Sequence, residues 1–335
     1  MSEIYHIPVL LEPSVEELNI NPSGTYVDLT FGGGGHSRAI LDKLNDGKLI
    51  VFDQDEDAWL NRIDDPRVFF VRHNFRFLYH FLNYLKAIPV DGILADLGVS
   101  SHHFDEAHRG FSFRFDAGLD MRMNRNTGNT AADVLNGYSE EQLIAVFKMY
   151  GEVSSAGRLV RDILHFRANQ PFRTTADLKD VAARFAPARD TARFLSQVFQ
   201  GLRIEVNGEM DALKEMLLAT PGVLKPGGRM VIISYHSLED RLVKNFFRTG
   251  DVNKSPAWNK GPGSGPRSWP GPVAVWRACV WRGVRESPAC AWFPPPRRRV
   301  REAASSGSQR HRHWKQAARP SGCGGSVRSG SRAEP

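Results

Sequence analysis

Apolar residues follow two different spacings along the first 100 residues, and the two spacings alternate. Short runs rich in β-branched and aromatic residues predict buried strands at 25–28, 48–53, 68–71 and 90–98. Segments with apolar residues three or four positions apart separate these runs and predict helices at 37–44, 56–63 and 75–86. Strands that alternate with helices form right-handed βαβ units, so the sequence predicts an α/β fold with a parallel sheet.

The alternation stops after residue 100 and resumes near residue 204. Between these positions we find only loop and helical patterns, with helices expected at 140–150, 156–168, 175–185 and 192–200. A helix at 204–219, a strand at 228–234 and a helix at 237–247 continue the sheet pattern, the last opening on the capping-box sequence Ser237-Leu-Glu-Asp240. We therefore expect a sheet domain formed by residues 1–100 and 204–250, interrupted by an inserted α-helical subdomain at 101–203.

The first predicted strand runs into four consecutive glycines, Gly32 to Gly35, and then directly into a helix. A turn without side chains can adopt positive φ angles and lets a ligand approach the backbone closely. In open parallel sheets, ligands bind outside the carboxyl ends of the strands. The sequence thus predicts a nucleotide-type pocket here, with a plain tight turn as the alternative.

Asp53 ends the second predicted strand, 21 positions after Gly32. A carboxylate at this place can accept two hydrogen bonds from a ribose diol. The glycine run fits a dinucleotide fingerprint only in part, because Arg38 stands where the third glycine belongs. This favours S-adenosylmethionine over a nicotinamide dinucleotide, with Asp28 and the loop backbone available to the amino-acid end of the cofactor.

The charge of the chain divides it into two regions. Residues 251–335 hold 16 Lys and Arg against 4 Asp and Glu, a net of +12, whereas the preceding 250 residues are net −5. The same tail contains six of the seven tryptophans, all three cysteines and no Leu, Ile, Met or Tyr, so it lacks the usual residues of a core. We expect a disordered basic extension, read in a shifted frame, with a nucleic-acid-binding arm as the alternative.

The segment after the fourth predicted strand carries further candidates for chemistry. Asp96 ends that strand, and Ser100 and Ser101 follow it. Aromatic and arginine residues are then interleaved in what reads as loop, which suits stacking on an unpaired base, although packing against the sheet is an equal alternative. No metal site is predicted, because the pair at 102–103 lacks a third ligand and the cysteines lack paired spacing.

Several motifs together resemble one protein family. They are His6-Ile-Pro-Val-Leu10, Phe31-Gly-Gly-Gly-Gly-His36, Asp96-Leu-Gly-Val-Ser-Ser101, Arg109-Gly-Phe-Ser-Phe113, Leu119-Asp-Met-Arg-Met123 and Ile233-Ser-Tyr-His-Ser-Leu-Glu-Asp-Arg241. In this order they resemble the bacterial small-subunit (16S) ribosomal RNA cytosine-N4 methyltransferases, the MraW/RsmH family. The resemblance implies a cytoplasmic, Rossmann-like class I methyltransferase that uses S-adenosylmethionine to methylate a cytosine amine in the decoding region, within an assembled or nearly assembled small subunit.

The resemblance also implies which residues contact the cofactor. These are Gly34, Gly35, His36, Asp53, Phe75, Asp96 and His103, the last standing where the family usually has Gln. A second departure lies at the C-terminus, where nothing after residue 250 matches the strand pair that closes the family's sheet.

For the substrate, we expect the cytosine amine to donate to Asp96, Ser100 or Ser101, and Phe111 or Phe113 to stack on the base. Residues 151–205 carry 9 Lys and Arg against 6 Asp and Glu, which predicts contact with RNA phosphates. The arginines concerned are Arg158, Arg161, Arg167 and Arg173, with a solvated helical face as the alternative. Two other functions remain open, a non-catalytic RNA-binding or assembly protein on the same fold and an NAD-dependent oxidoreductase.

Overall fold

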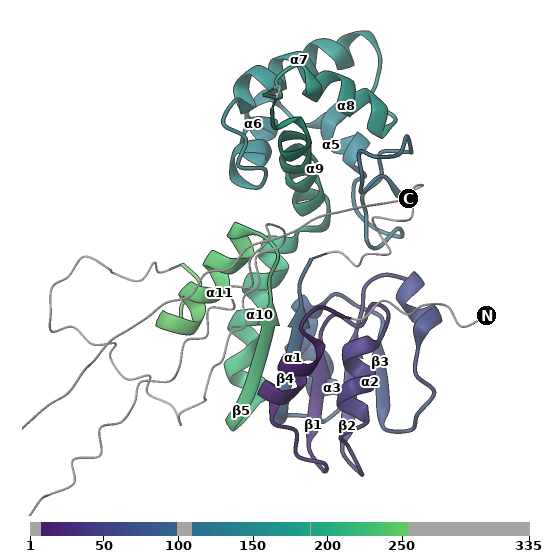
Figure 1. Ribbon diagram of the computed structural model, residues 1–335, viewed down its shortest axis with the longest axis vertical. Coiled ribbons are helices and arrows are strands. Elements are labelled where there is room, and N and C mark those ends of the chain that lie inside the picture. The colour runs from purple at the N-terminus through teal and green to yellow at the C-terminus, as the bar shows by residue number, and fades with distance from the viewer. Residues whose placement is uncertain (1–7, 99–108, 188, 254–335) are drawn as a thin grey trace, which may run out of the picture. The chain divides into compact units, whose positions relative to one another are not determined.

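The computed structural model describes residues 8–98, 109–187 and 189–253. Within them, five parallel strands form one sheet in the order β3-β2-β1-β4-β5 (Figure 1). The strands are β1 (Thr25–Asp28), β2 (Lys48–Phe52), β3 (Val68–Val71), β4 (Val90–Asp96) and β5 (Leu224–Ile233). The predicted α/β fold with a parallel sheet is confirmed.

Successive residues of each strand enter two different hydrophobic cores, as the two-residue period of a strand requires. One core takes alternate residues such as Val27, Ile50, Ile93 and Ile232, and the other takes Tyr26, Leu49, Leu94 and Val231. Helices α3 (Leu78–Tyr84), α10 (Glu209–Val223) and α11 (Ser237–Thr249) contribute to the first core. Helices α1 (Leu11–Leu18) and α2 (Gly35–Leu41) contribute to the second. Helices therefore cover both faces of the sheet.

Two predicted helices are shorter than the sequence pattern indicated. The segment predicted as a helix at 56–63 is a 3₁₀ turn, Asp57–Asn61, and the helix predicted at 75–86 begins with a second 3₁₀ turn, Phe75–Phe77. The cause is local hydrogen bonding by side chains. Asp55 Oδ1 accepts from the N–H of Asp57, and Asn74 Oδ1 accepts from the N–H of Arg76. Such bonds compete with the α-helical ladder and favour tight turns.

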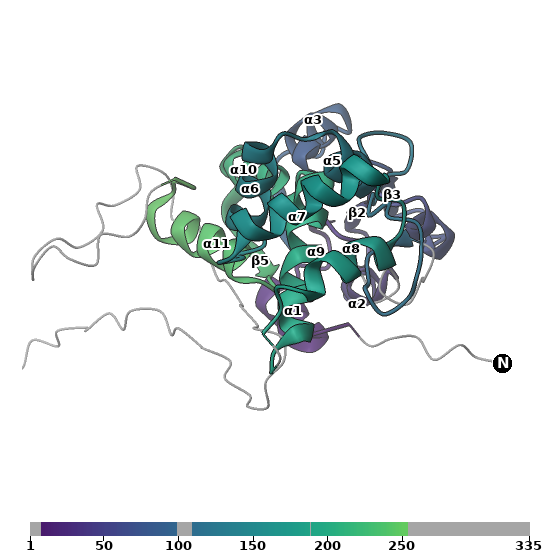
Figure 2. The ribbon, with the colours of Figure 1, turned by 90° about the horizontal axis from the view of Figure 1, so that it is seen from above.

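The segment inserted between β4 and β5 is helical in its described part. It contains α5 (Ala131–Gly137), α6 (Glu140–Met149), α7 (Ala156–Asn169), α8 (Thr175–Ala183) and α9 (Thr191–Asn207). Helix α6 packs against α7 and α9, and α8 packs against the same two helices (Figure 2). These helices share a hydrophobic core of their own. Of the five, only α5 was not predicted; a capping box formed by Thr130 and Asp133 begins it.

Two helix boundaries differ from the sequence prediction. Helix α9 continues through residue 204 and ends at Gly208, whose φ of 57° is left-handed, so the next helix begins at Glu209. Helix α11 is capped by His236 rather than by Ser237, and its capping box pairs His236 with Glu239. No helix in the described ranges is long and apolar enough to cross a membrane. The basic tail expected at 251–335 lies outside the described residues beyond Asn253.

Candidate active site

The glycine turn joins β1 to α2, as predicted, and two of its glycines stand where no side chain would fit. Gly34 has a φ of 75°, and a Cβ there would lie 2.8 Å from the Phe31 ring. A Cβ on Gly35 would lie 2.2 Å from Pro8. Glycine is therefore required both by the left-handed backbone and by the close approach of neighbouring residues.

Asp53 lies directly after β2 and its carboxylate faces the glycine turn. Its Oδ2 accepts from the N–H of Gly32 at 2.8 Å, and its Oδ1 accepts from the N–H of Asp55 at 2.9 Å. A carboxylate has about four lone-pair positions, so a carboxylate at this place can accept from a ribose diol in addition to backbone N–H groups. Phe75 follows β3 and is partly buried against the first core.

Asp28 and Asp96 end the adjacent strands β1 and β4, and a hydrogen-bonded network joins their ends. The Ser37 hydroxyl donates to Asp28 Oδ2 at 2.6 Å, and the Asp96 N–H donates to Thr30 Oγ1 at 2.7 Å. His36 Nδ1 lies 3.8 Å from Asp96 Oδ2, and the buried Nε2 of His36 has no hydrogen-bond partner within the described residues. A buried nitrogen of this kind needs a hydrogen-bond partner, which a water molecule or a ligand can supply.

Tyr235, two residues after β5, completes this network. Its hydroxyl donates to Asp96 Oδ1 at 2.7 Å. Burial raises the pKa of Asp96 to about 6, although the hydrogen bond from Tyr235 and the neighbouring His36 act to lower it. Burial together with the Asp96 carboxylate raises the pKa of Tyr235, so that its phenol remains a hydrogen-bond donor. Asp96 can thus be ionised at neutral pH and can act as a hydrogen-bond acceptor.

The sequence analysis includes Tyr235 in the motif at 233–241 but predicts no role for it. The available signal was its place just after the fifth strand, next in the sheet to the strand that Asp96 ends. The other predicted acceptors, Ser100 and Ser101, and the predicted cofactor contact His103 lie outside the described residues.

The loop predicted to hold exposed base-stacking residues is largely buried in its described part. Phe111 is 4% exposed and belongs to the core of the inserted helices, so its ring has no open face for a base in this conformation. Phe113 is partly buried and packs edge-on against Phe199, with ring centroids 5.6 Å apart. In this conformation Phe111 packs inside the inserted helices and not against the sheet, which was the alternative considered, and its stacking role stays a prediction.

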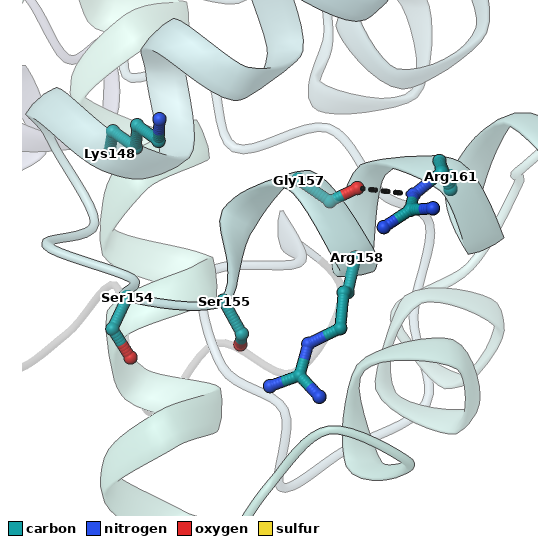
Figure 3. A pocket seen from close by; sticks show the side chains of 6 residues that line it. All are labelled: Lys148, Ser154, Ser155, Gly157, Arg158 and Arg161. Carbon is teal, nitrogen blue, oxygen red and sulfur yellow. Dashed lines mark hydrogen bonds between the residues drawn. The ribbon is translucent and has the colours of Figure 1, made fainter.

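The arginines of the inserted helices divide into two groups. Arg167 is half-buried and donates to the backbone carbonyls of Leu135 and Tyr138 at 2.8 and 2.7 Å, so its NH1 stabilises the subdomain from within, and its RNA contact stays a prediction. Arg158, Arg161 and Arg173 are exposed. Arg158 and Arg161 also line a cavity of about 310 Å³ at the start of α7, which is shown in Figure 3. Its other lining residues are Lys148, Ser154, Ser155 and Gly157.

Glu209, His236 and Glu239 also lie close together, with potential ligand atoms within 4.8 Å of one another. Arg203 donates two bonds of 2.9 Å to Glu209, and His236 Nε2 lies 3.3 Å from Glu239 Oε1. Burial raises the pKa of Glu239, but hydrogen bonding from His236 and the charge of Arg203 outweigh it, so its pKa is below the usual value. The charges are thus paired within the protein, which gives this cluster a structural explanation.

Comparison with known proteins agrees with the motifs. The family model described as the MraW methylase family matches residues 3–258. The chain is 56% identical over 249 residues to a Bacteroides fragilis (strain YCH46) protein named Ribosomal RNA small subunit methyltransferase H, covering 74% of this chain and 82% of that protein. A Flavobacterium johnsoniae protein of the same name is 52% identical over 253 residues, covering 75% of this chain and 84% of that protein.

A solved structure of a putative methyltransferase from an antibiotic biosynthesis pathway of Anabaena variabilis covers 61% of this chain and 92% of its own at 15% identity. Its TM-score is 0.23. The family match covers the whole described sheet and its insertion, and it confirms the resemblance that the motifs indicated. The chain belongs to the MraW methylase family.

Proposed function

We propose that this protein transfers the methyl group of S-adenosylmethionine to the N4 amine of a cytosine in the decoding region of small-subunit ribosomal RNA. The observation that carries the proposal is the arrangement of three carboxylates, Asp53, Asp28 and Asp96. They stand at the carboxyl ends of β2, β1 and β4, which are neighbours in the sheet, beside the glycine turn. Ligands of open parallel sheets bind at this edge.

The residues at this edge fit S-adenosylmethionine. Gly34 and Gly35 are the residues of the turn that would contact it, and Asp53 would accept hydrogen bonds from its ribose. Phe75 would contact the cofactor from the end of β3, and His36 has a buried ring nitrogen that needs a partner. His103, which lies outside the described residues, is a further expected contact of the cofactor. When bound, the cofactor supplies an electrophilic methyl group on a sulfonium.

The target amine needs assistance because its lone pair is delocalised into the cytosine ring. Methyl transfer forms an N–C bond, breaks the S–C bond and leaves the cofactor sulfur as a neutral thioether, while the nitrogen loses a proton. Asp96 can accept a hydrogen bond from the amine as the nitrogen becomes tetrahedral, and it can accept the released proton. Ser100 and Ser101 remain alternative acceptors that follow β4, and Phe113 remains a candidate for contact with the base.

We propose that the inserted helices, within residues 101–203, recognise the RNA, and that residues 1–100 and 204–250 form the cofactor domain. The cavity lined by Arg158, Arg161 and Lys148 supports this division, since it gathers three cations from α6 and α7 and two serine hydroxyls from the segment between these helices. Such side chains bind phosphate oxygens. The substrate would be the assembled or nearly assembled small subunit.

Methyl transfer from labelled S-adenosylmethionine tests the proposal on three substrates, namely small subunits, free small-subunit RNA and large subunits. We expect label in one cytosine of the small subunit, identified by nuclease digestion and mass spectrometry. In the same assay Asp96→Asn should bind S-adenosylhomocysteine normally but lose most of the transfer. Full transfer by this variant would show that Asp96 is not the acceptor of the cytosine amine.

Two outcomes would favour the other functions considered. RNA and cofactor binding without transfer by the unmodified chain would indicate a non-catalytic assembly protein. Thermal stabilisation by NAD but not by S-adenosylmethionine would indicate an oxidoreductase.

A further inference from the structure

The guanidinium of Arg109 lies buried between the loop that follows β2 and the loop that leads into the inserted helices. The side chain is 2% exposed. Its NH1 donates to Asp55 Oδ2 at 2.5 Å and to Asp57 Oδ2 at 3.1 Å. Its NH2 donates to the carbonyls of Arg122 and Met123 at 2.9 and 3.0 Å. One side chain thus fixes two segments that are more than 50 residues apart in the sequence.

On the sheet side, this contact continues directly to the proposed ribose-binding carboxylate. The N–H of Asp55 donates to Asp53 Oδ1 at 2.9 Å, and the N–H of Gly32 donates to Asp53 Oδ2 at 2.8 Å. Because the Asp55 side chain is held by Arg109, the backbone N–H that orients Asp53 is held as well. A shift of the 54–57 loop would therefore rotate the Asp53 carboxylate away from its present direction.

On the other side, Arg109 is itself fixed by the fold of the insertion. Asn207, at the end of α9, accepts from the N–H of Met123 and donates to the carbonyl of Met121, both at 2.8 Å. The Met121 N–H in turn donates to the carbonyl of Arg109 at 3.1 Å. Gly110 permits this close packing, because its φ is 74° and a Cβ there would lie 2.3 Å from the carbonyl oxygen of Gly118.

We propose that Arg109 is a positioning residue of the cofactor site, which holds Asp53 in its ribose-binding orientation through Asp55 and connects that orientation to the inserted helices. The inference rests on the proposed function, since it assumes that Asp53 binds the ribose. An arginine suits this role because its planar group can bind two carboxylates and two carbonyls at the same time. A lysine would retain the charge but could not make all of these bonds.

The test is the affinity for S-adenosylhomocysteine and for its 2′,3′-dideoxy analogue, measured by calorimetry on the full chain. We expect Arg109→Lys and Arg109→Met to weaken binding of S-adenosylhomocysteine on the order of tenfold and to leave binding of the dideoxy analogue within about twofold. An analogue without ribose hydroxyls has no donors for Asp53, so an effect that passes through Asp53 disappears with it.

Arg67→Met is the matched control. Arg67 likewise binds a carboxylate, that of Asp65, and two carbonyls, those of Leu44 and Asn45. It contacts one carboxylate where Arg109 contacts two, and its side chain is 29% exposed. It precedes β3 and therefore lies at the opposite edge of the sheet from the glycine turn. Its replacement should leave both affinities unchanged. Thermal melting of each variant verifies folding, and Arg109→Lys retains the buried charge if Arg109→Met fails to fold.

Asp53→Ala separates failure of this inference from failure of the proposed function. If Asp53→Ala leaves the affinity for S-adenosylhomocysteine unchanged, the ribose assignment is wrong and the inference falls with it. If Asp53→Ala weakens binding but both Arg109 variants bind normally, only the inference is overturned. Equal weakening of both ligands by the Arg109 variants would also overturn it, because the effect would then not pass through the ribose.

Discussion

The Tyr235 hydroxyl donates a hydrogen bond to Asp96 Oδ1 over a distance of 2.7 Å. The two residues are 139 positions apart, and they meet because β4 and β5 are parallel neighbours whose carboxyl ends lie at the same edge of the sheet. The bond favours the ionised form of a carboxylate whose pKa is raised to about 6 by burial. Tyr235 therefore keeps Asp96 available as an acceptor at neutral pH.

Tyr235→Phe should shift the pH dependence of methyl transfer. A carboxylate with a pKa of about 6 loses its charge as the pH falls through that value, so the rate of the unmodified protein should decline below about pH 6. Loss of the Tyr235 hydrogen bond raises the pKa of Asp96 further, which moves this decline to higher pH while the rate recovers in alkaline buffer. Single-turnover rates measured between about pH 5 and about pH 9 test for this shift of the decline.

Tyr138→Phe is the control for this experiment, because the Tyr138 hydroxyl also donates to a carboxylate, that of Glu205 within the inserted helices, at 2.9 Å. Tyr138→Phe should leave the pH dependence of methyl transfer unchanged. An unchanged acid limb in Tyr235→Phe would contradict the role of the pair.

Gly34→Ala should both destabilise the protein and impair cofactor binding. The left-handed φ of 75° costs an L side chain on the order of 1–2 kcal/mol, and the new Cβ would lie within 2.8 Å of the Phe31 ring. Urea unfolding should show a lower midpoint with the same slope. Gly137→Ala serves for comparison, since a Cβ there meets open space at the end of α5. Equal midpoints for the two variants would show that the turn tolerates a side chain.

The sheet and its three terminal acids could be predicted because strand and helix periods are local properties of the sequence. Asp28, Asp53 and Asp96 stand at strand ends wherever the strands pair, so their meeting follows from parallel topology alone. The loop from Arg109 to Met123 could not be read in this way. Its arginine and aromatic residues suit an exposed RNA-binding surface and a buried contact within the protein equally well. Only the long-range contact of Arg109 with Asp55 decides between the two.

For the same reason, the positions of basic residues in the sequence could not show which arginines are exposed and available to RNA. Arg158 and Arg167 lie on one helix and are equivalent in a count of basic residues, yet Arg158 is exposed whereas Arg167 binds two carbonyls of a neighbouring segment. The difference depends on which face of α7 packs against the segment around Leu135. Tertiary packing of this kind is not contained in the local pattern.

Charge reversal at the α7 cavity should weaken RNA binding. Arg158→Glu combined with Arg161→Glu should reduce affinity for small-subunit RNA by an order of magnitude or more at low salt. It should also flatten the dependence of log K on log salt, by roughly 0.7 for each lost phosphate contact. Filter binding from low to moderate salt measures both quantities.

The comparison variant reverses Arg184 and Arg193, exposed arginines of the same insertion that lie 3.8 and 3.5 Å from Asp162 and Asp190. It makes the same change in net charge away from the cavity. If both double variants lose affinity equally, binding depends on net charge and not on this surface.

His236 should stabilise α11 as its N-cap and should not bind a metal ion. Its Nδ1 accepts from the N–H of Glu239, and its Nε2 lies 3.3 Å from Glu239 Oε1. The nitrogen that caps the helix has no lone pair left for a metal ion. His236→Ala should lower the free energy of unfolding by about 0.5–2 kcal/mol, whereas His236→Asn, whose side-chain oxygen can cap the helix, should recover most of that loss. Chemical denaturation with and without EDTA measures both effects, and a lower midpoint with EDTA would establish a metal site in place of the cap.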